Sequence, residues 1–468
     1  MQIPMLKGDK IGSNTDYRDG LLTNMYAVKR DILGAKGYLM SFYGLSGFAE
    51  GGGVDRGGKW VSREGLEGHY RLSGTDFIKI DENGLVTVLG AIAGSDQASI
   101  DFSFNNVAVV AGGKLFYYNP TDGFRQMTDP DIGTPIDIVW VDGYFFLTDG
   151  ETIYHSNILN EEQYEPLAFA NAEFMPDSSR GLGRTEENEV LVFGEFSKQS
   201  FINVGATPFA FQTIPRKNQK IGILGVHCKK ELSGKWYTLS RRENTAPSFH
   251  IISIGTEQSI STRETDVILQ SYTDDELSTS TVDAFIDGNV TFIMFHLPGH
   301  TLVFNESVAE TFGLESSWSI LKTDTTGDLT YRGRNIVRDP RNGKWLIGDK
   351  RDGNIGEIDR TICTHYGAMV EWLIHTPAVM LETGSINKLE IETIPGVSPD
   401  NDATVFISMS QDMRANSMEY SKEYGMNNQF GLRFIVRRLG YVRSWVTFRL
   451  RGVSRSRMAF SKFDIEVS

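Results

Sequence analysis

The chain has 468 residues, too many for one simple hydrophobic core, so we expect two or more domains or one large repeat array. Its formal net charge of -14 excludes general binding of duplex DNA over the whole surface, because the phosphates would be repelled. No apolar run approaches the roughly eighteen residues of a membrane span, and the first ten residues lack the hydrophobic segment of a secretory signal.

The two cysteines, Cys228 and Cys363, could form a disulfide. We expect two separate buried thiols instead, because nothing else in the sequence requires an oxidising compartment.

Residues 1–58 differ in pattern from the rest of the chain. Gly20 and Gly34 interrupt the helix-compatible pieces of Asp16–Leu33, which indicates an extended arm with one helical turn near Val28–Leu33. The glycine-rich stretch Gly51–Gly58 is not followed by the Lys-Ser/Thr of a phosphate-binding loop, so it predicts a flexible connection or a bulged turn.

Residues 59–375 consist of short apolar runs separated by turn residues. Gly112-Gly113 and Asp142-Gly143 each separate two such runs, which is typical of a two-residue hairpin. One strand per unit can be marked near Tyr70, Val107, Tyr144, Val190, Trp236, Val290 and Trp345. The spacing of these strands, roughly 37 to 55 residues, is near the period of four-stranded propeller blades.

Strands joined by tight turns disfavour a parallel α/β fold, which needs helical crossovers. This part of the chain therefore predicts an irregular β-propeller of six or seven blades, with a pair of large β-sandwiches as the alternative. Thr262–Leu277 is the best helix candidate, and Tyr366–Leu373 is a short linker helix or a strand.

The pattern changes after Thr376-Pro377. Leu389 and Ile391 alternate with Glu390 and Glu392, which is the period of a half-buried strand. Further strands and one loop are predicted at Thr404–Ser410, Leu432–Val436, Tyr441–Leu450 and Phe463–Val467, with the loop at Pro395–Asp402. Residues 376–468 thus predict a separate C-terminal antiparallel β-sandwich, and the whole chain is predicted to be all-β.

No combination of residues indicates an active site. His296 and His300 have the spacing of a zinc-binding helix, but Pro298 between them predicts a turn. Carboxylate pairs such as Asp129 and Asp131 belong to turn sequences, where Asp caps its own backbone. We therefore predict no catalytic residue, no cofactor and no metal site, and a protein that is not an enzyme.

Positive charge is concentrated near the C-terminus. Nine basic residues and no acidic ones lie between Tyr424 and Phe463, so the rest of the chain has a net charge of -23. Two interpretations are open. Alternating strands would place these basic side chains on a solvated face, or the side chains form a contact surface for an acidic protein or for DNA phosphate. The candidate contact residues are Arg437, Arg438, Arg443, Arg449, Arg451, Arg455 and Arg457. Aromatic residues for base stacking are few nearby, so specific single-strand recognition is not expected.

Short motifs follow one another along the chain in a fixed order. They are Asn24-Met25-Tyr26-Ala27, Ile32-Leu33, Gly37-Tyr38-Leu39, Ser41-Phe42-x-Gly44, Ser271-Tyr272-Thr273-x-x-Glu276, His296-Leu297-Pro298-x-His300-x-Leu302-Val303, Tyr331-Arg332-Gly333, Gly348-Asp349-Lys350, Thr376-Pro377, Arg438-x-Gly440-x-x-Arg443 and Phe448-x-Leu450. Together they resemble the packaged-DNA stabilisation proteins, the tail hubs or tail accessory factors of short-tailed bacteriophages of enteric bacteria. One departure is Tyr43, where the family pattern has proline.

The resemblance implies a structural virion protein that forms a homo-hexameric ring below the portal and adaptor rings. Such a tail hub helps to close the head and retain packaged double-stranded DNA, holds the tail needle, attaches the tailspikes and forms part of the ejection channel. It implies a place in the virion tail after assembly in the host cytoplasm, and only non-specific contact with DNA. A basic C-terminal domain and an acidic propeller could then supply the two different faces that a ring contact needs.

A propeller that binds or cleaves glycans is the alternative from a different functional class. It would need aromatic and carboxylate side chains gathered around a pocket. A cellular scaffold propeller is a third alternative, although no regular repeat signature is present.

Overall fold

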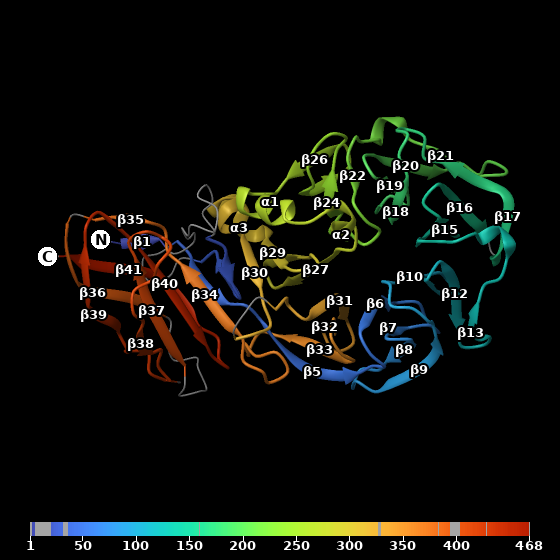
Figure 1. Cartoon of the computed structure of the whole chain (residues 1–468). Helices are drawn as coiled ribbons and strands as arrows, with labels where there is room; N and C mark the ends of the chain where they lie inside the picture. The colour runs from blue at the N-terminus through green and yellow to red at the C-terminus, as the bar shows by residue number, and fades with distance from the viewer. Residues whose placement is uncertain are drawn as a thin grey trace.

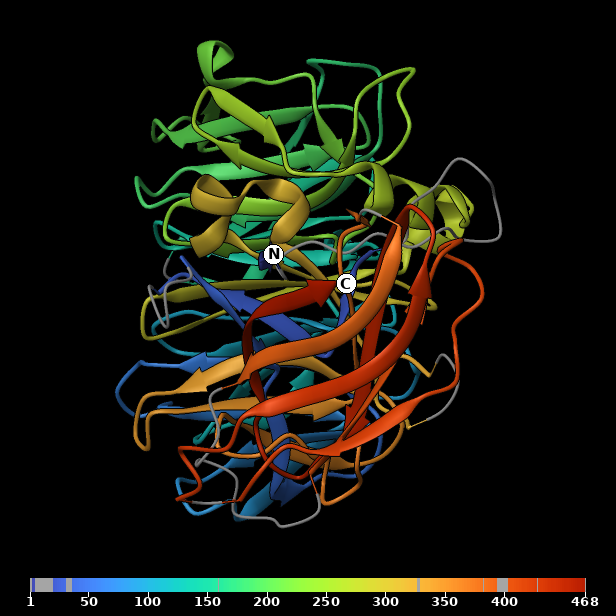
Figure 2. The same ribbon diagram turned by 90° about the vertical axis from the view of Figure 1, so that its left-hand side faces the viewer.

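The computed structural model describes residues 2–4, 20–30, 36–158, 160–325, 329–381, 383–393, 403–426 and 428–467. These residues form a β-propeller and, beside it, a β-sandwich (Figure 1). In Figure 2 the long strands of the sandwich lie in front of the propeller. The predicted all-β fold, with a propeller followed by a C-terminal sandwich, is confirmed.

The first five blades are sheets of strands that follow one another along the chain. Blade 1 contains β6 (Asp55–Val61), β7 (Gly68–Ser73), β8 (Asp76–Ile80) and β9 (Val86–Ala91). Blade 2 contains β10 (Ser99–Phe102), β11 (Val107–Ala111), β12 (Lys114–Asn119) and β13 (Gly123–Gln126). Blade 3 contains β14 (Asp137–Val141), β15 (Tyr144–Thr148), β16 (Thr152–Asn157) and β17 (Asn160–Asn171). Blade 4 contains β18 (Ser179–Arg184), β19 (Val190–Gly194), β20 (Lys198–Asn203) and β21 (Phe211–Thr213). Blade 5 contains β22 (Gly222–Ile223), β23 (Lys229–Leu232), β24 (Lys235–Arg241), β25 (Ser248–Ser253) and β26 (Thr256–Ser259).

The last two blades draw on other parts of the chain. Blade 6 contains β27 (Thr281–Asp287), β28 (Val290–His296), β29 (Thr301–Asn305) and β30 (Trp318–Leu321). Blade 7 contains β31 (Gly333–Asp339), β32 (Lys344–Asp349), β33 (Asn354–Asp359) and, as its outer strand, β5 (Gly44–Glu50). Pairing of Gly44 with Asp359 and of Glu50 with Asn354 attaches β5 to β33 and closes the ring of blades.

The described residues therefore form seven blades, and each strand marked from the sequence lies in a different one. These strands have hydrogen-bonded neighbours on both sides. In the first four blades they are buried along their whole length, as β7, β11, β15 and β19 show. Burial on both faces explains why β11, β15 and β19 are nearly continuous apolar runs. Strand β7 differs, because it contains the buried polar residues His69 and Arg71.

The sandwich combines strands from both ends of the chain. Its first sheet has the order β3 (Met25–Val28), β4 (Tyr38–Ser41), β41 (Ala459–Val467), β36 (Gly384–Thr393) and β39 (Phe434–Val442), with β1 (Gln2–Pro4) on β41. Its second sheet has the order β34 (Glu371–His375), β40 (Trp445–Val453), β37 (Thr404–Ser410) and β38 (Tyr420–Glu423), with β35 (Val379–Met380) on β40. Strand β2 (Leu22–Thr23) pairs with both β30 and β34, so one continuous sheet runs from blade 6 into the sandwich.

Residues 1–58, predicted as an extended arm, thus contain strands that pair with both the propeller and the sandwich. A helical turn was predicted to begin near Val28, but β3 is extended up to that residue, and residues 31–35 lie outside the described part. The glycine-rich stretch was predicted as a flexible connection or a bulged turn. It contains a bulge between Asp55 and Gly57. The division at residues 58/59 and 375/376 stays a prediction.

Two sequence predictions are corrected in detail. The helix predicted over Thr262–Leu277 is two short helices, α1 (Arg263–Gln270) and α2 (Asp274–Ser278), because Thr273 and Glu276 form a capping box that begins a new helix. The strand predicted over Tyr441–Leu450 is split by a turn at Arg443 and Ser444 between β39 and β40. The predicted loop Pro395–Asp402 lies outside the described residues.

The remaining short elements are α3 (Glu306–Phe312) and three 3-10 turns, η1 (Pro130–Ile132), η2 (Pro215–Lys217) and η3 (Leu314–Ser316). Tyr366–Leu373 was predicted as a short helix or a strand; only Glu371–Leu373 lie in a strand, β34, which extends to His375. Both cysteines are buried and free, as expected. Burial raises the pKa of each thiol to about 12.

Candidate functional site

The junction between propeller and sandwich is built from aromatic residues of the N-terminal segment. Tyr26, Phe42 and Tyr43 pack against Phe292 of blade 6, with ring centroids 5.1 to 5.7 Å apart. Arg457 from the sandwich donates a hydrogen bond of 3.0 Å to the Tyr26 hydroxyl and lies 5.3 Å from the centre of the Tyr43 ring. Tyr43, the departure from the family pattern, therefore contributes a buried ring to this junction.

Two of the candidate arginines have partners within the sandwich. Arg449 and Arg451 both donate to Glu419, with Nη2 atoms 2.5 and 2.7 Å from its carboxylate oxygens. Arg451 also lies 3.3 Å from Glu371. The pKa of Glu419 is lowered to about 2 by the hydrogen bonds from Arg451 and Arg449 and by the positive charges of these two side chains. Burial alone would raise this pKa. The positive charge of this pair is therefore partly neutralised inside the protein.

Four candidate arginines are exposed: Arg437, Arg438, Arg443 and Arg455. Arg437 and Arg438 lie on β39, the edge strand of the first sandwich sheet, and Arg443 lies in the turn that follows it. Arg438 has a φ of 60°, next to an irregularity in the pairing of β36 with β39. Within the described ranges none of the four side chains makes an ion pair. The structure thus brings three of the seven predicted residues together along one exposed edge.

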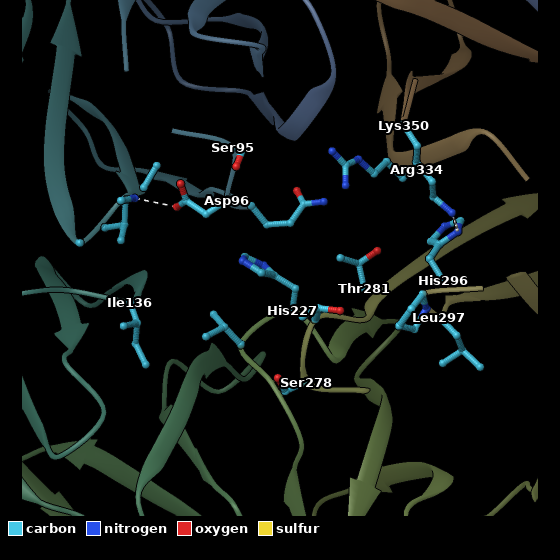
Figure 3. Close-up of a pocket in the computed structure, with 18 of the residues that line it drawn as sticks. Ser95, Asp96, Ile136, His227, Ser278, Thr281, His296, Leu297, Arg334 and Lys350 are labelled. Atoms are coloured by element: carbon cyan, nitrogen blue, oxygen red, sulfur yellow. Dashed lines mark hydrogen bonds between the residues drawn. The ribbon is translucent and has the colours of Figure 1, made fainter. Parts of the chain in front are cut away.

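A cavity of about 570 Å³ lies where the blades converge (Figure 3). Its walls come from blades 2, 5, 6 and 7 and from the segments between blades, including Ser95, Asp96, His227, Thr281, Arg334 and Lys350. Figure 3 shows Arg334 and Lys350 on one side of this axial cavity and Asp96 on the other.

A chain of polar contacts supports the Lys350 side of the cavity. His296 Nε2 lies 3.0 Å from Asp283 Oδ2, and Lys350 Nζ lies 3.1 Å from His296 Nδ1. Because an ionised carboxylate only accepts hydrogen bonds, Nε2 carries the imidazole proton and Nδ1 accepts from Lys350. The same carboxylate accepts the backbone N–H groups of Asn335 and Ile336, which joins blade 6 to blade 7.

Burial controls the ionisation of these groups. Burial and the nearby Arg334 charge lower the pKa of Lys350 to about 7. Burial lowers the pKa of His296 and of His227 to about 4, so both rings are neutral at pH 7. Burial raises the pKa of Asp283, but the hydrogen bond and charge of His296 and the charge of Lys230 outweigh it and bring the value to about 2.

His296 and His300 do not act as the pair that their spacing suggested. His296 binds Asp283, whereas His300 Nδ1 contacts the Tyr272 hydroxyl at the other end of the turn. Asp129 caps the backbone N–H of Asp131, which is the turn role expected for that pair. Sequence reasoning missed Arg334 and Lys350 as site residues. One sequence pattern could have indicated Arg334. It is a charged residue in the first strand of a blade, β31, and these first strands line the propeller axis.

The described lining of the axial cavity contains no Trp, Tyr or Phe, and Asp96 is its only carboxylate. Asp96 forms an ion pair of 2.9 Å with Arg56. A glycan site needs aromatic platforms, and glycoside cleavage normally needs two carboxylates. The cavity therefore does not match the glycan-binding or glycan-cleaving alternative.

Comparison with known proteins covers the whole chain. A family model described as bacteriophage P22 Gp10, beta-propeller, matches residues 1–363. A second, described as bacteriophage P22 Gp10, beta-sandwich, matches residues 371–468. The chain belongs to the P22 Gp10 family. Its members include the tail hub protein gp10 of Salmonella phage P22, which is 28% identical over 485 aligned residues that cover 100% of this chain and 99% of the relative.

Membership of the Gp10 family identifies the chain as a structural tail hub protein of a short-tailed bacteriophage. The two family models agree with the observed propeller and sandwich. No helix in the described part of this Gp10-family chain has the length and apolar character needed to cross a membrane.

Solved structures resemble the Gp10 propeller only distantly. The extracellular domain of the putative one component system BT4673 from B. thetaiotaomicron has a TM-score of 0.45 and 10% identity, with 69% of this chain and 41% of that chain covered. A virginiamycin B lyase from Staphylococcus aureus has a TM-score of 0.43 and 10% identity, with 65% of this chain and 94% of that chain covered. Similarity at this level carries no argument about function.

Proposed function

We propose that this chain forms a homo-hexameric ring in the phage tail and joins the portal–adaptor assembly to the tail needle and the tailspikes. The observation that carries the proposal is the end-to-end similarity to the P22 tail hub protein, which includes both domains. In this role the ring closes the filled head, retains the packaged double-stranded DNA and forms part of the ejection channel. Contact with DNA is non-specific, and the ring is added to the virion during assembly in the host cytoplasm.

The connection between the two domains supports a structural role rather than an enzymatic one. Residues 22–50 supply β2 to the shared sheet, β3 and β4 to the sandwich and β5 to blade 7 in succession. Removing any one of these strands would leave unpaired backbone groups in a neighbouring sheet. A hub that holds several partners in fixed positions needs this kind of rigid attachment.

The exposed arginines on one edge of the sandwich support a charged ring contact. A closed ring with rotational symmetry brings one face of each subunit against a different face of the next. Arg437, Arg438 and Arg443 lie on an exposed edge, while the chain outside the basic stretch is strongly acidic. We assign the contact mainly to these three and to Arg455. Arg449, Arg451 and Arg457 have internal partners and contribute less.

The mass of the purified protein in solution tests this proposal. Light scattering is measured for the protein alone and after mixing with a purified portal–adaptor complex. A closed ring, formed alone or only on the complex, is the expected result, and the second case would show that the adaptor templates assembly. A monomer that ignores the complex would contradict the proposal.

A further inference from the structure

Two cationic side chains at the axial cavity lack an anionic partner. Neither Arg334 nor Lys350 has a carboxylate within ion-pair distance among the residues that the structure describes. Among the described residues the acceptors of Lys350 Nζ are both neutral, His296 Nδ1 at 3.1 Å and Thr301 Oγ1 at 3.2 Å. The Arg334 guanidinium lies 2.8 Å from the Gln97 amide, which accepts a hydrogen bond when its oxygen faces Arg334.

The carboxylates near these two cations are already committed to other groups. Asp283 binds His296 and two backbone N–H groups, and Asp349 pairs with Arg332. Asp55 pairs with Arg71 at 2.7 Å, and Asp96 pairs with Arg56 across the cavity. Asp283 and Asp349 therefore attract Arg334 and Lys350 only from beyond ion-pair distance. A directly bound anion would stabilise the two cations further, because partly buried charges are costly without a contacting partner.

The cavity has the size and donors of an anion site. Its volume of about 570 Å³ is within the usual range for small-molecule pockets. Neutral donors, including Thr281 and Thr330, line it together with the two cations. In Figure 3 the Arg334 guanidinium extends toward the middle of the cavity. The absence of aromatic rings from the described lining favours a compact ligand over a stacked base or an extended glycan chain.

We propose that the axial cavity binds a small oxyanion, a sulfate, phosphate or carboxylate group, with Arg334 and Lys350 as its charged contacts and Thr281 and Thr330 as neutral donors. The proposal does not depend on ring formation or on the tail partners. The anion would be held where blades 6 and 7 meet at the propeller axis.

The protonation of Lys350 gives the site a distinct pH dependence. The charged or titratable groups around it are Arg334, Arg351, Asp283, Asp349 and His296. Since the pKa of Lys350 is about 7 and those of His296 and His227 are about 4, only Lys350 changes charge between pH 6 and pH 8.5. Sulfate keeps its charge over this range. Its affinity should therefore fall as the pH rises.

The experiment uses the full chain, sodium sulfate as the probe and sodium chloride to hold the ionic strength constant. Calorimetric titration at pH 6 should show saturable binding, and binding at pH 8.5 should be about tenfold weaker, because one charge-assisted hydrogen bond is lost. Sulfate should also raise the midpoint of thermal unfolding, and it should raise it more at pH 6 than at pH 8.5.

Arg334→Ala should weaken sulfate binding by about tenfold or more. Arg338→Ala, an exposed arginine on the same strand β31, is the matched control and should bind as the wild type does. Lys350→Met should remove the pH dependence, and it provides a second test if Arg334→Ala does not fold. Equal sulfate effects on the wild type, Arg334→Ala and Lys350→Met would reflect a general salt effect and would overturn the proposal.

A sulfated monosaccharide and a uronic acid distinguish the sources of the anion. Tighter binding of either than of sulfate would support the site and assign it to an anionic sugar of small size. Binding of free sulfate as tightly as the sugars would support the site and assign it to the free ion.

Discussion

The propeller and the sandwich differ in how far apart in the sequence their paired strands lie. In blades 1 to 4 every strand pairs with its neighbour in sequence. In the sandwich, β41 near the C-terminus lies between β4 and β36, and β34 pairs with β40. The propeller is thus assembled from local hairpins and needs one distant strand, β5, to close. The sandwich contains two local pairs, β3–β4 and β37–β38, but its other pairings join strands that are not neighbours in sequence. Local pairing costs little loop-closure entropy, while distant pairing must be stabilised by packing.

The two domains also use charge differently. The propeller contains fully buried ion pairs, as in Arg71–Asp55, where both side chains are at most 1% exposed. In the sandwich the pairs involve partly exposed side chains, as in Arg451–Glu419. Breaking a buried pair leaves a desolvated charge, whereas water screens an exposed one, so we expect mutations in the propeller to have the larger effects.

The largest effect is expected for Asp283→Ala at the interface of blades 6 and 7. The change leaves His296 and the N–H groups of Asn335 and Ile336 without their acceptor, and should lower the free energy of unfolding by about 3–5 kcal/mol. Chemical denaturation measures the loss. Asp287→Ala on the same strand, where the carboxylate pairs with the exposed Arg360, is the control and should cost less than about 1 kcal/mol. Equal losses in the two variants would contradict the contrast between buried and exposed pairs.

The carboxylate of Asp283 should make the stability of the propeller sensitive to acid. Its pKa in the folded protein is about 2, below the ordinary value of 3.8, so its stabilising effect is complete above about pH 4 and is lost as the pH falls through about 2. The difference in unfolding free energy between wild type and Asp283→Ala should shrink by about 2 kcal/mol across that interval. A constant difference down to pH 2 would show that folding leaves the pKa of the Asp283 carboxyl at its ordinary value.

Leu45→Ala tests the closure of the propeller by β5. Leu45 is fully buried in the cluster that joins blade 7 to blade 6, so the cavity left behind should cost about 2–5 kcal/mol. Leu85→Ala removes the same atoms from a side chain that is 68% exposed and should change the unfolding free energy by less than about 0.5 kcal/mol. If the Leu45 variant were as stable as the Leu85 variant, β5 would not be needed to hold the ring of blades closed.

Glu419→Gln addresses the sandwich and should have a smaller effect. It removes the charge that Arg449 and Arg451 share, at a cost of about 1 kcal/mol that decreases in high salt. Glu423→Gln, an exposed residue at the end of β38, is the control and should be neutral. Thermal unfolding at low and high salt measures both. A loss as large as that of Asp283→Ala would remove the proposed difference between the domains.

The smallest effect on stability is expected for the double charge reversal Arg437→Glu and Arg438→Glu. Both side chains are exposed, so the unfolding free energy should change by less than about 0.5 kcal/mol. Ring formation or docking on the portal–adaptor complex should nevertheless weaken, since like charges would face each other. Light scattering compares this variant with Arg216→Glu on the propeller surface. Unchanged assembly of the double variant would exclude this edge as a contact.

Several features could be read from the sequence because short stretches encode them. The Gly112-Gly113 turn has φ values of 60° and 69°, and the Asp142-Gly143 turn has 48° and 93°, as primed hairpin turns require. The apolar runs marked one per unit recovered every blade, and the alternation around Leu389 and Ile391 placed both residues inside the sandwich. Dihedral preference and period-two burial act over a few residues, so the sequence by itself determined the strands, the turns and the two kinds of domain.

Only the tertiary structure decided which distant strands meet. No local signal shows that residues 44–50 pair with residues 354–359, or that β2 links blade 6 to the sandwich. The same holds for the side chains. Glu419 accepts hydrogen bonds from two of the seven candidate arginines. Arg334, Lys350 and His296 meet at the axial cavity from three different strands or turns. These contacts depend on the closure of the ring of blades and on packing between residues hundreds of positions apart, where neither turn chemistry nor periodicity carries information.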